Sequence, residues 1–192
     1  MKLTGPLRSE ALAARDITSV ESCFLARTDD VAAEPQAVCR SRLHRDLPED
    51  VLSGLRLHGN CRALDLSFLL LPRERECIAE YTLRYIERNG QRPESDPSAV
   101  FFLGDNPSNR LTWSAASSAI PTLRRNAGFI WSPFLGRWLL ARELFAAMGF
   151  PAFPGIEQAL ATRCPNYGSP SDGRKLLGNA MHRSEEHTSE LQ

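Results

Sequence analysis

The clearest pattern of apolar and polar positions in the chain follows Pro72. Apolar side chains recur there at spacings of three and four residues, which places them on one helix face: Ile78, Tyr81, Tyr85 and Ile86. Asn89-Gly90 is a stop signal, because glycine accepts the left-handed conformation that closes a helix. The pattern therefore predicts an amphipathic helix from Pro72 to about Asn89.

The N-terminal part carries weaker patterns. The segment up to about Arg45 is rich in alanine and arginine and has little periodicity, apart from a short helix expected after Pro6. Acidic residues follow Pro48, and acids near a helix N-terminus interact favourably with the helix dipole. A second helix is therefore predicted there, ending at Gly54 or at His58-Gly59.

Three more elements are predicted beyond Gly90. Residues 99–103 form an apolar run closed by the turn residues 104–107, which is typical of a strand and a turn. Residues 139–148 have helical spacing, with Gly149 and Pro151 as terminators, and another helix is expected over 174–182. No internal repeat is evident. Helices mixed with a few short strands predict an α/β chain.

Composition fits a folded protein and limits its partners. The 192 residues suffice for one domain or slightly more, and 42% apolar with 24% charged residues is ordinary for a globular chain. Lys+Arg and Asp+Glu both number 23, so a broad nucleic-acid-binding surface is not expected. Two local basic clusters remain, at residues 40–45 and 124–125, and solvated helix faces would explain both.

The five cysteines do not form a metal or disulfide pattern. They are scattered, with no Cys-x-x-Cys spacing and no histidine at zinc-finger spacing: Cys23, Cys39, Cys61, Cys77 and Cys164. This predicts reduced thiols in an intracellular protein without a metal site. No apolar run of about 18 residues predicts a membrane span, and the N-terminus lacks the apolar core of a signal peptide.

The last ten residues have an unusual coding property. The string AGA TCG GAA GAG CAC ACG TCT GAA CTC CAG, which resembles a short-read sequencing adapter, translates to residues 183–192. We therefore expect this tail to be an assembly artefact that is disordered and dispensable, with the natural C-terminus missing. His187 and the acids beside it are then no metal site.

The segment 120–151 and a later Gly-Asn-Ala carry the one family resemblance. The segment resembles the late conserved block of cytosine-5 DNA methyltransferases, which runs P-T-L-T, then R-x-L-T-x-x-E, then Q-G-F-P. The matching residues are Pro121, Thr122, Leu123, Arg137, Leu139, Glu143, Gly149, Phe150 and Pro151. Gly178, Asn179 and Ala180 resemble the last block, a G-N-[AS]-V helix start. The ordered resemblance covers residues 101–182.

The chain also departs from this family. Leu140 stands where the family has the Thr that caps the helix, so Glu143 is expected to lose its capping partner, and Leu140→Thr is expected to stabilise the chain. Ala146 and Met148 replace a usual Arg and Gln. The cofactor turn F-x-G-x-G, the Pro-Cys nucleophile loop and Glu-Asn-Val are absent, and Arg40-Ser41-Arg42 only faintly echoes Q-x-R-x-R.

The resemblance implies a fragment of a methyltransferase-like fold. The chain would be the C-terminal part of an S-adenosylmethionine-dependent enzyme that methylates DNA. Its expected location is intracellular, with the nucleus as the candidate compartment. It would pack beside a doubly wound sheet supplied by a missing N-terminal catalytic half. Residues 1–98 would be variable and could correspond to the target-recognition region; 99–182 would be the methyltransferase-like segment, followed by the tail 183–192.

The resemblance also assigns roles to single residues. None is catalytic. Thr122, Arg137, Glu143, Gly149, Phe150 and Pro151 would brace the DNA-recognition region against the catalytic core, with Arg137 and Glu143 fixing the turn into the helix. A turn at Gly178, Asn179 and Ala180 would form one wall of the cofactor pocket. The chain alone is expected neither to bind S-adenosylmethionine tightly nor to methylate DNA.

Simpler explanations stay open for each of these features. Arg137 and Glu143 could form a surface ion pair, 149–151 a plain helix stop with an apolar anchor, and Asn179 a plain turn. The tryptophans fit core positions better than base stacking: Trp113, Trp131 and Trp138. His44 and His58 fit loop positions. For the whole chain, the alternatives are a non-catalytic relative that binds DNA or protein, and a gene fragment without function.

Overall fold

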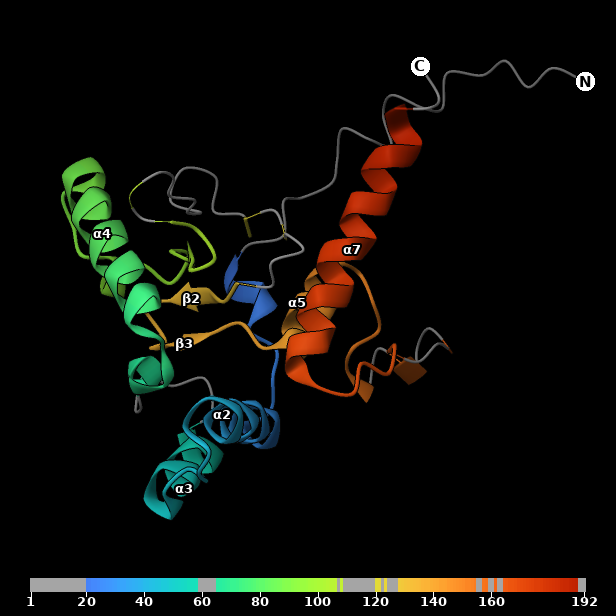
Figure 1. The fold of residues 1–192 in the computed structure, drawn as a ribbon, viewed down its shortest axis with the longest axis horizontal. Coiled ribbons are helices and arrows are strands. Elements are labelled where there is room, and N and C mark those ends of the chain that lie inside the picture. Colours follow the sequence, from blue (N-terminus) through green and yellow to red (C-terminus); the bar gives the residue numbers. More distant parts are fainter. Residues whose placement is uncertain are drawn as a thin grey trace, which may run out of the picture.

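The computed structural model describes residues 20–58, 65–106, 108, 120–121, 123, 128–154, 157–158, 161 and 164–189, the side chains of 58 and 180–189 excepted. In chain order the elements are η1 (Val20–Cys23), α2 (Thr28–Leu43), α3 (Glu49–His58), η2 (Leu66–Leu69), α4 (Pro72–Asn89), η3 (Pro93–Ser95), β1 (Phe101–Phe102), β2 (Ile130–Ser132), β3 (Arg137–Trp138), α5 (Ala141–Ala147) and α7 (Pro170–Ser189). Helices therefore dominate, mixed with short strands, which confirms the α/β class at a coarse level (Figure 1).

The strands form one small antiparallel sheet in the order β1-β2-β3. Trp131 in β2 pairs with Phe101 on one side and with Trp138 on the other. The predicted strand over 99–103 is confirmed at its centre by β1, whereas β2 and β3 were not predicted. Every strand residue is buried, because α4 and the α2–α3 pair lie to one side of the sheet and α5 with α7 to the other (Figure 1).

Two apolar clusters form the core, one on each face of the sheet. Successive strand residues point to opposite faces, so Phe101 belongs to the cluster of α2, α3 and α4, and Phe102 to the cluster of α5 and α7. The first cluster also contains Tyr81 and Trp138, and the second contains Val20 and Leu144. Each cluster thus draws on both sides of the predicted boundary at residue 98.

The main helix predictions are confirmed. α4 spans Pro72–Asn89 and ends at Gly90, whose φ of 68° is the left-handed conformation expected of a closing glycine. α3 begins after Pro48 and continues to the later of its two predicted ends. α5 covers most of 139–148. The helix expected after Pro6 lies outside the described residues.

The helix α2 was missed. Its buried positions include Glu34 and Pro35 beside Val31, Ala32, Val38 and Cys39, so a charge and a proline interrupt the apolar face. Proline in a helix interior removes one backbone hydrogen bond. Glu34 is buried because its carboxylate bonds to residues in distant segments of the chain. The spacing of apolar residues within α2 does not contain that information, so it did not predict the helix.

The helix α7 begins earlier than predicted and changes the interpretation of the last motif. Ser169 caps it: its Oγ accepts from the backbone N of Asp172 at 3.2 Å, with Pro170 in the first helical position. The interior of α7 therefore contains Gly178-Asn179-Ala180, which is neither a helix start nor a turn. The backbone of α7 continues to Ser189, and the disorder and dispensability of the tail stay predictions.

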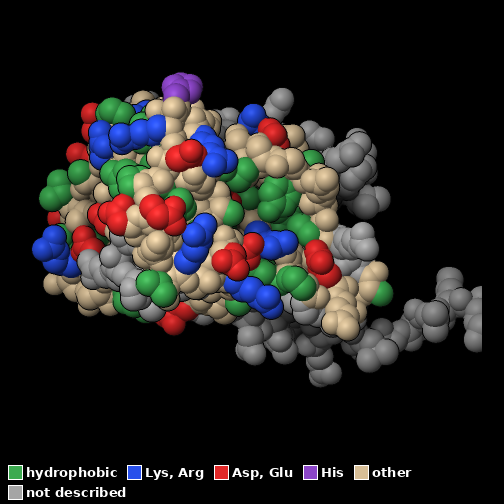
Figure 2. Space-filling model, turned by 90° about the horizontal axis from the view of Figure 1, so that it is seen from below, with side chains coloured by type: hydrophobic (Ala, Val, Ile, Leu, Met, Phe, Trp, Pro, Cys, Tyr) green, Lys and Arg blue, Asp and Glu red, His purple; other side chains and the backbone are tan. Residues whose placement is uncertain are grey.

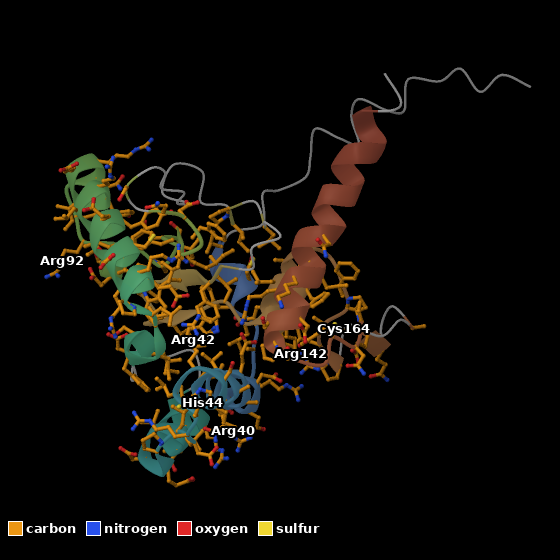
Figure 3. All side chains as sticks on the ribbon, viewed as in Figure 1. Arg40, Arg42, His44, Arg92, Arg142 and Cys164 are labelled. Carbon is orange, nitrogen blue, oxygen red and sulfur yellow. The ribbon has the colours of Figure 1, made fainter. Side chains whose placement is uncertain are left out.

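Charges of both signs are interspersed on the face over α2 and α3 (Figure 2). Two arginines of the cluster at 40–45 have acidic partners: Arg40 pairs with Asp46 and Arg42 with Glu74. The solvated-face interpretation is thus confirmed for the exposed Arg40 but not for the half-buried Arg42. His44, beside them, ends α2 in the left-handed conformation with φ 53° (Figure 3).

Candidate functional site

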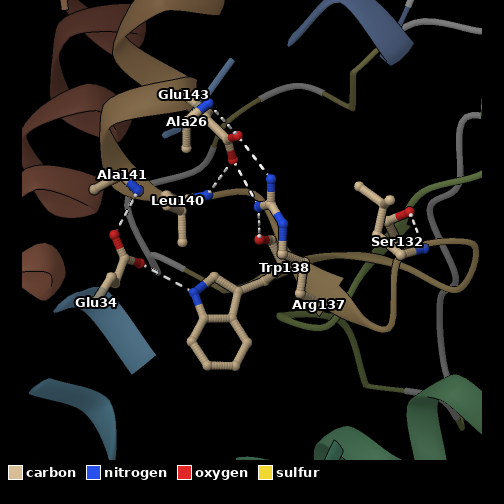
Figure 4. Close-up of polar contacts among 9 residues, drawn as sticks. Ala26, Glu34, Ser132, Arg137, Trp138, Leu140, Ala141 and Glu143 are labelled. Carbon is tan, nitrogen blue, oxygen red and sulfur yellow. Dashed lines mark hydrogen bonds and ion pairs between the residues drawn. The ribbon is translucent and has the colours of Figure 1, made fainter. Parts of the chain in front are cut away.

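Two of the residues that carry the resemblance, Arg137 and Glu143, meet where β3 turns into α5. The guanidinium of Arg137 forms a bidentate ion pair with the carboxylate of Glu143. Nη1 lies 2.9 Å from Oε2 and Nη2 lies 2.8 Å from Oε1 (Figure 4). Their side chains are 3% and 0% exposed. The surface ion pair considered from the sequence is therefore wrong, and the pair is a buried, bidentate one.

Backbone groups complete the partners of this pair. Glu143 accepts from the backbone N of Leu140 at 2.9 Å and of Ala26 at 3.1 Å, while Arg137 donates to the carbonyl of Trp138 at 2.8 Å. Burying an ion pair is costly unless its polar atoms are also bonded, and these contacts give both Glu143 oxygens and Nη1 of Arg137 a second partner. The pair therefore fixes the β3–α5 turn and attaches the segment before α2 to it.

The capping of α5 differs from the expectation. Leu140 is the N-cap residue and its side chain has no acceptor atom, so the half of a capping box that Thr supplies is missing. The other half persists, because Glu143 still accepts from the Leu140 backbone N. Leu140 itself is 2% exposed and packs in the core cluster of α2 and α4. The predicted gain from Leu140→Thr is therefore reversed, since the substitution removes buried apolar area.

A second buried carboxylate, missed in the sequence, lies on the other side of the same turn. Glu34 of α2 accepts from Trp138 Nε1 at 3.0 Å and from the Ala141 backbone N at 2.9 Å (Figure 4). It also accepts from Arg174 Nη1 at 2.5 Å. It thus links α2, α5 and α7. Its partners lie 104 to 140 residues away, so no local spacing could have revealed it.

The Gly-Phe-Pro segment closes α5. Gly149 has φ 83°, the left-handed region that glycine tolerates best. Phe150 contacts the edge of Phe145, with ring centroids 5.5 Å apart, and Pro151 is buried. The geometry fits a helix stop with an apolar anchor. Thr122 lies outside the described residues.

The last motif is only partly visible. Within α7, Gly178 is buried and Asn179 is exposed, while the side chain of Ala180 lies outside the described residues. A cavity of about 490 Å³ between α2 and α3 is lined mainly by charged and polar residues and by neither Gly178 nor Asn179. At this motif the described residues thus show one exposed amide, that of Asn179.

Three of the described cysteines, Cys23, Cys77 and Cys164, are not activated as nucleophiles. Burial raises the pKa of the Cys77 thiol to about 12, and burial also raises the pKa of Cys23 and of Cys164. A nucleophilic cysteine needs the opposite shift, because the thiolate is the reactive form. Cys61 lies outside the described residues. No Cys, His, Asp or Glu cluster suited to a metal ion occurs among the residues with described positions.

Two tryptophans are core residues. Trp131 is 3% and Trp138 0% exposed, and the Trp138 ring stacks on Phe129 with centroids 4.4 Å apart. The core interpretation is confirmed for both, and Trp113 lies outside the described residues. Within the described ranges, no helix has the length and apolar character needed to cross a membrane.

Comparison of the chain with known protein families, with curated proteins and with solved structures finds no match.

Proposed function

We propose that this chain is the C-terminal part of a cytosine-5 DNA methyltransferase-like protein, in which it supports DNA recognition and bounds the cofactor site without supplying a catalytic residue. The observation that carries the proposal is the buried pair of Arg137 and Glu143. These two residues were selected by the motif alone, and they meet at the helix start that the resemblance assigns to them.

The surrounding contacts support a bracing role. The turn between β3 and α5 is attached to α2 and α7 through Glu34, and to Ala26 through Glu143. A turn held by two carboxylates and two arginines is rigid, because each bidentate or shared contact fixes side-chain rotamers. Such a rigid segment could keep a DNA-recognition region in a fixed position relative to a catalytic half of the protein.

The proposal assigns the chemistry to residues outside this chain. Attack on carbon 6 of a flipped cytosine needs a thiolate held about 3–3.5 Å from it, and burial disfavours the thiolate of the buried Cys23 and Cys77. S-adenosylmethionine needs an enclosing site, and Asn179 offers an exposed amide on one helix. Both requirements therefore fall to another part of the protein.

The first experiment sequences the full-length transcript. The proposal expects an upstream, in-frame Pro-Cys loop and F-x-G-x-G turn. An intact reading frame without them contradicts the enzyme and favours the non-catalytic binding relative; a frame broken by stop codons favours a gene fragment.

The second experiment uses the protein. The full-length product should transfer a labelled methyl group to cytosine in mixed-sequence DNA, whereas residues 1–182 alone should neither do so nor bind S-adenosylmethionine in a calorimetric titration. Cofactor binding by the chain alone with a dissociation constant on the order of 1 μM, or transfer above a no-protein control, contradicts the proposed division of labour.

A further inference from the structure

We draw no further inference here: the strongest candidate, the row of exposed apolar side chains on the outer face of α4 (Ala79, Leu83 and Ile86), is a helix face, and nothing among the described residues shows what covers it.

Discussion

The starts of α4 and α5 are built from almost the same five residues, yet they lie in different environments. Leu70-Leu71-Pro72-Arg73-Glu74 begins α4, and Leu139-Leu140-Ala141-Arg142-Glu143 begins α5. In both, a leucine is the N-cap with nearly equal dihedrals, φ −66° and ψ 155° against φ −67° and ψ 155°. In both, the glutamate accepts from the N-cap backbone N and takes a two-pronged arginine.

The two starts differ in the origin of the arginine and in burial. Arg137 precedes Glu143 by six residues, whereas Arg42 lies in α2, 32 residues before Glu74. The Arg137 side chain is buried in the core, and the Arg42 side chain is 21% exposed. Leu140 is 2% exposed and Leu71 46%. The same local sequence thus forms the same helix start, while tertiary packing decides how much each ion pair and each leucine contributes to the free energy of unfolding.

The largest expected effect is that of Glu143→Gln. It leaves the Arg137 guanidinium buried without its carboxylate, which costs about 3–5 kcal/mol. Chemical denaturation of residues 1–182 measures the change in the free energy of unfolding. Glu76→Gln, at an exposed position of α4, is the matched control and should change little. A loss below about 1 kcal/mol for Glu143→Gln contradicts the picture of a buried pair.

A smaller loss is expected for Glu74→Gln, the corresponding change in α4. Arg42 is partly solvated and keeps the Leu69 carbonyl as an acceptor at 3.0 Å, so the cost should be about 1–3 kcal/mol. The same denaturation experiment measures it. Comparison of the two glutamates is decisive: a larger loss at Glu74 than at Glu143 reverses the ranking that burial predicts.

Leu140→Thr should destabilise the chain by about 0.5–2 kcal/mol. The loss of a buried leucine side chain outweighs the gain from the new hydroxyl cap, since burial contributes about 1.5–3 kcal/mol and a cap about 1 kcal/mol. The thermal midpoint should fall by a few degrees. A raised midpoint would show that the cap matters more than the apolar contact.

The smallest effect is expected for Leu71→Thr, and it has the opposite sign. Leu71 is half exposed, so little buried area is lost and the hydroxyl can accept from the backbone N of Glu74, the N3 residue. The free energy of unfolding should rise by about 0.5–1 kcal/mol. A decrease here, equal to that of Leu140→Thr, would mean that exposure does not distinguish the two leucines.

The same comparison explains what the sequence could predict. The helix α4 was predictable because its apolar spacing, its proline start and its glycine stop agree with one another. The helix α2 was not, because its buried face includes Glu34, whose partners Trp138, Ala141 and Arg174 are brought to it only by the fold. The spacing of apolar residues and the capping residues predict contacts within one helix. They do not predict hydrogen bonds between residues that are far apart in the sequence.

The candidate site likewise contains features that the sequence predicted and features that only the structure shows. The motif selected Arg137 and Glu143, but their burial and the contact with Ala26 required the structure. Gly178 was assigned to a turn because the resemblance suggested a helix start there. The signal that places the start earlier, Ser169 and Asp172 around a proline, was present in the sequence and is a helix-capping pattern.

Two double-mutant cycles test the central claim most directly. One combines Arg137→Met with Glu143→Gln, the other Arg42→Met with Glu74→Gln, and each yields a coupling free energy from the denaturation of four proteins. We expect a coupling of about 3 kcal/mol for the buried pair and about 1 kcal/mol for the partly exposed one. Equal couplings, or a stronger one between Arg42 and Glu74, would contradict the account in which burial makes the Arg137–Glu143 pair at the α5 start the stronger of the two.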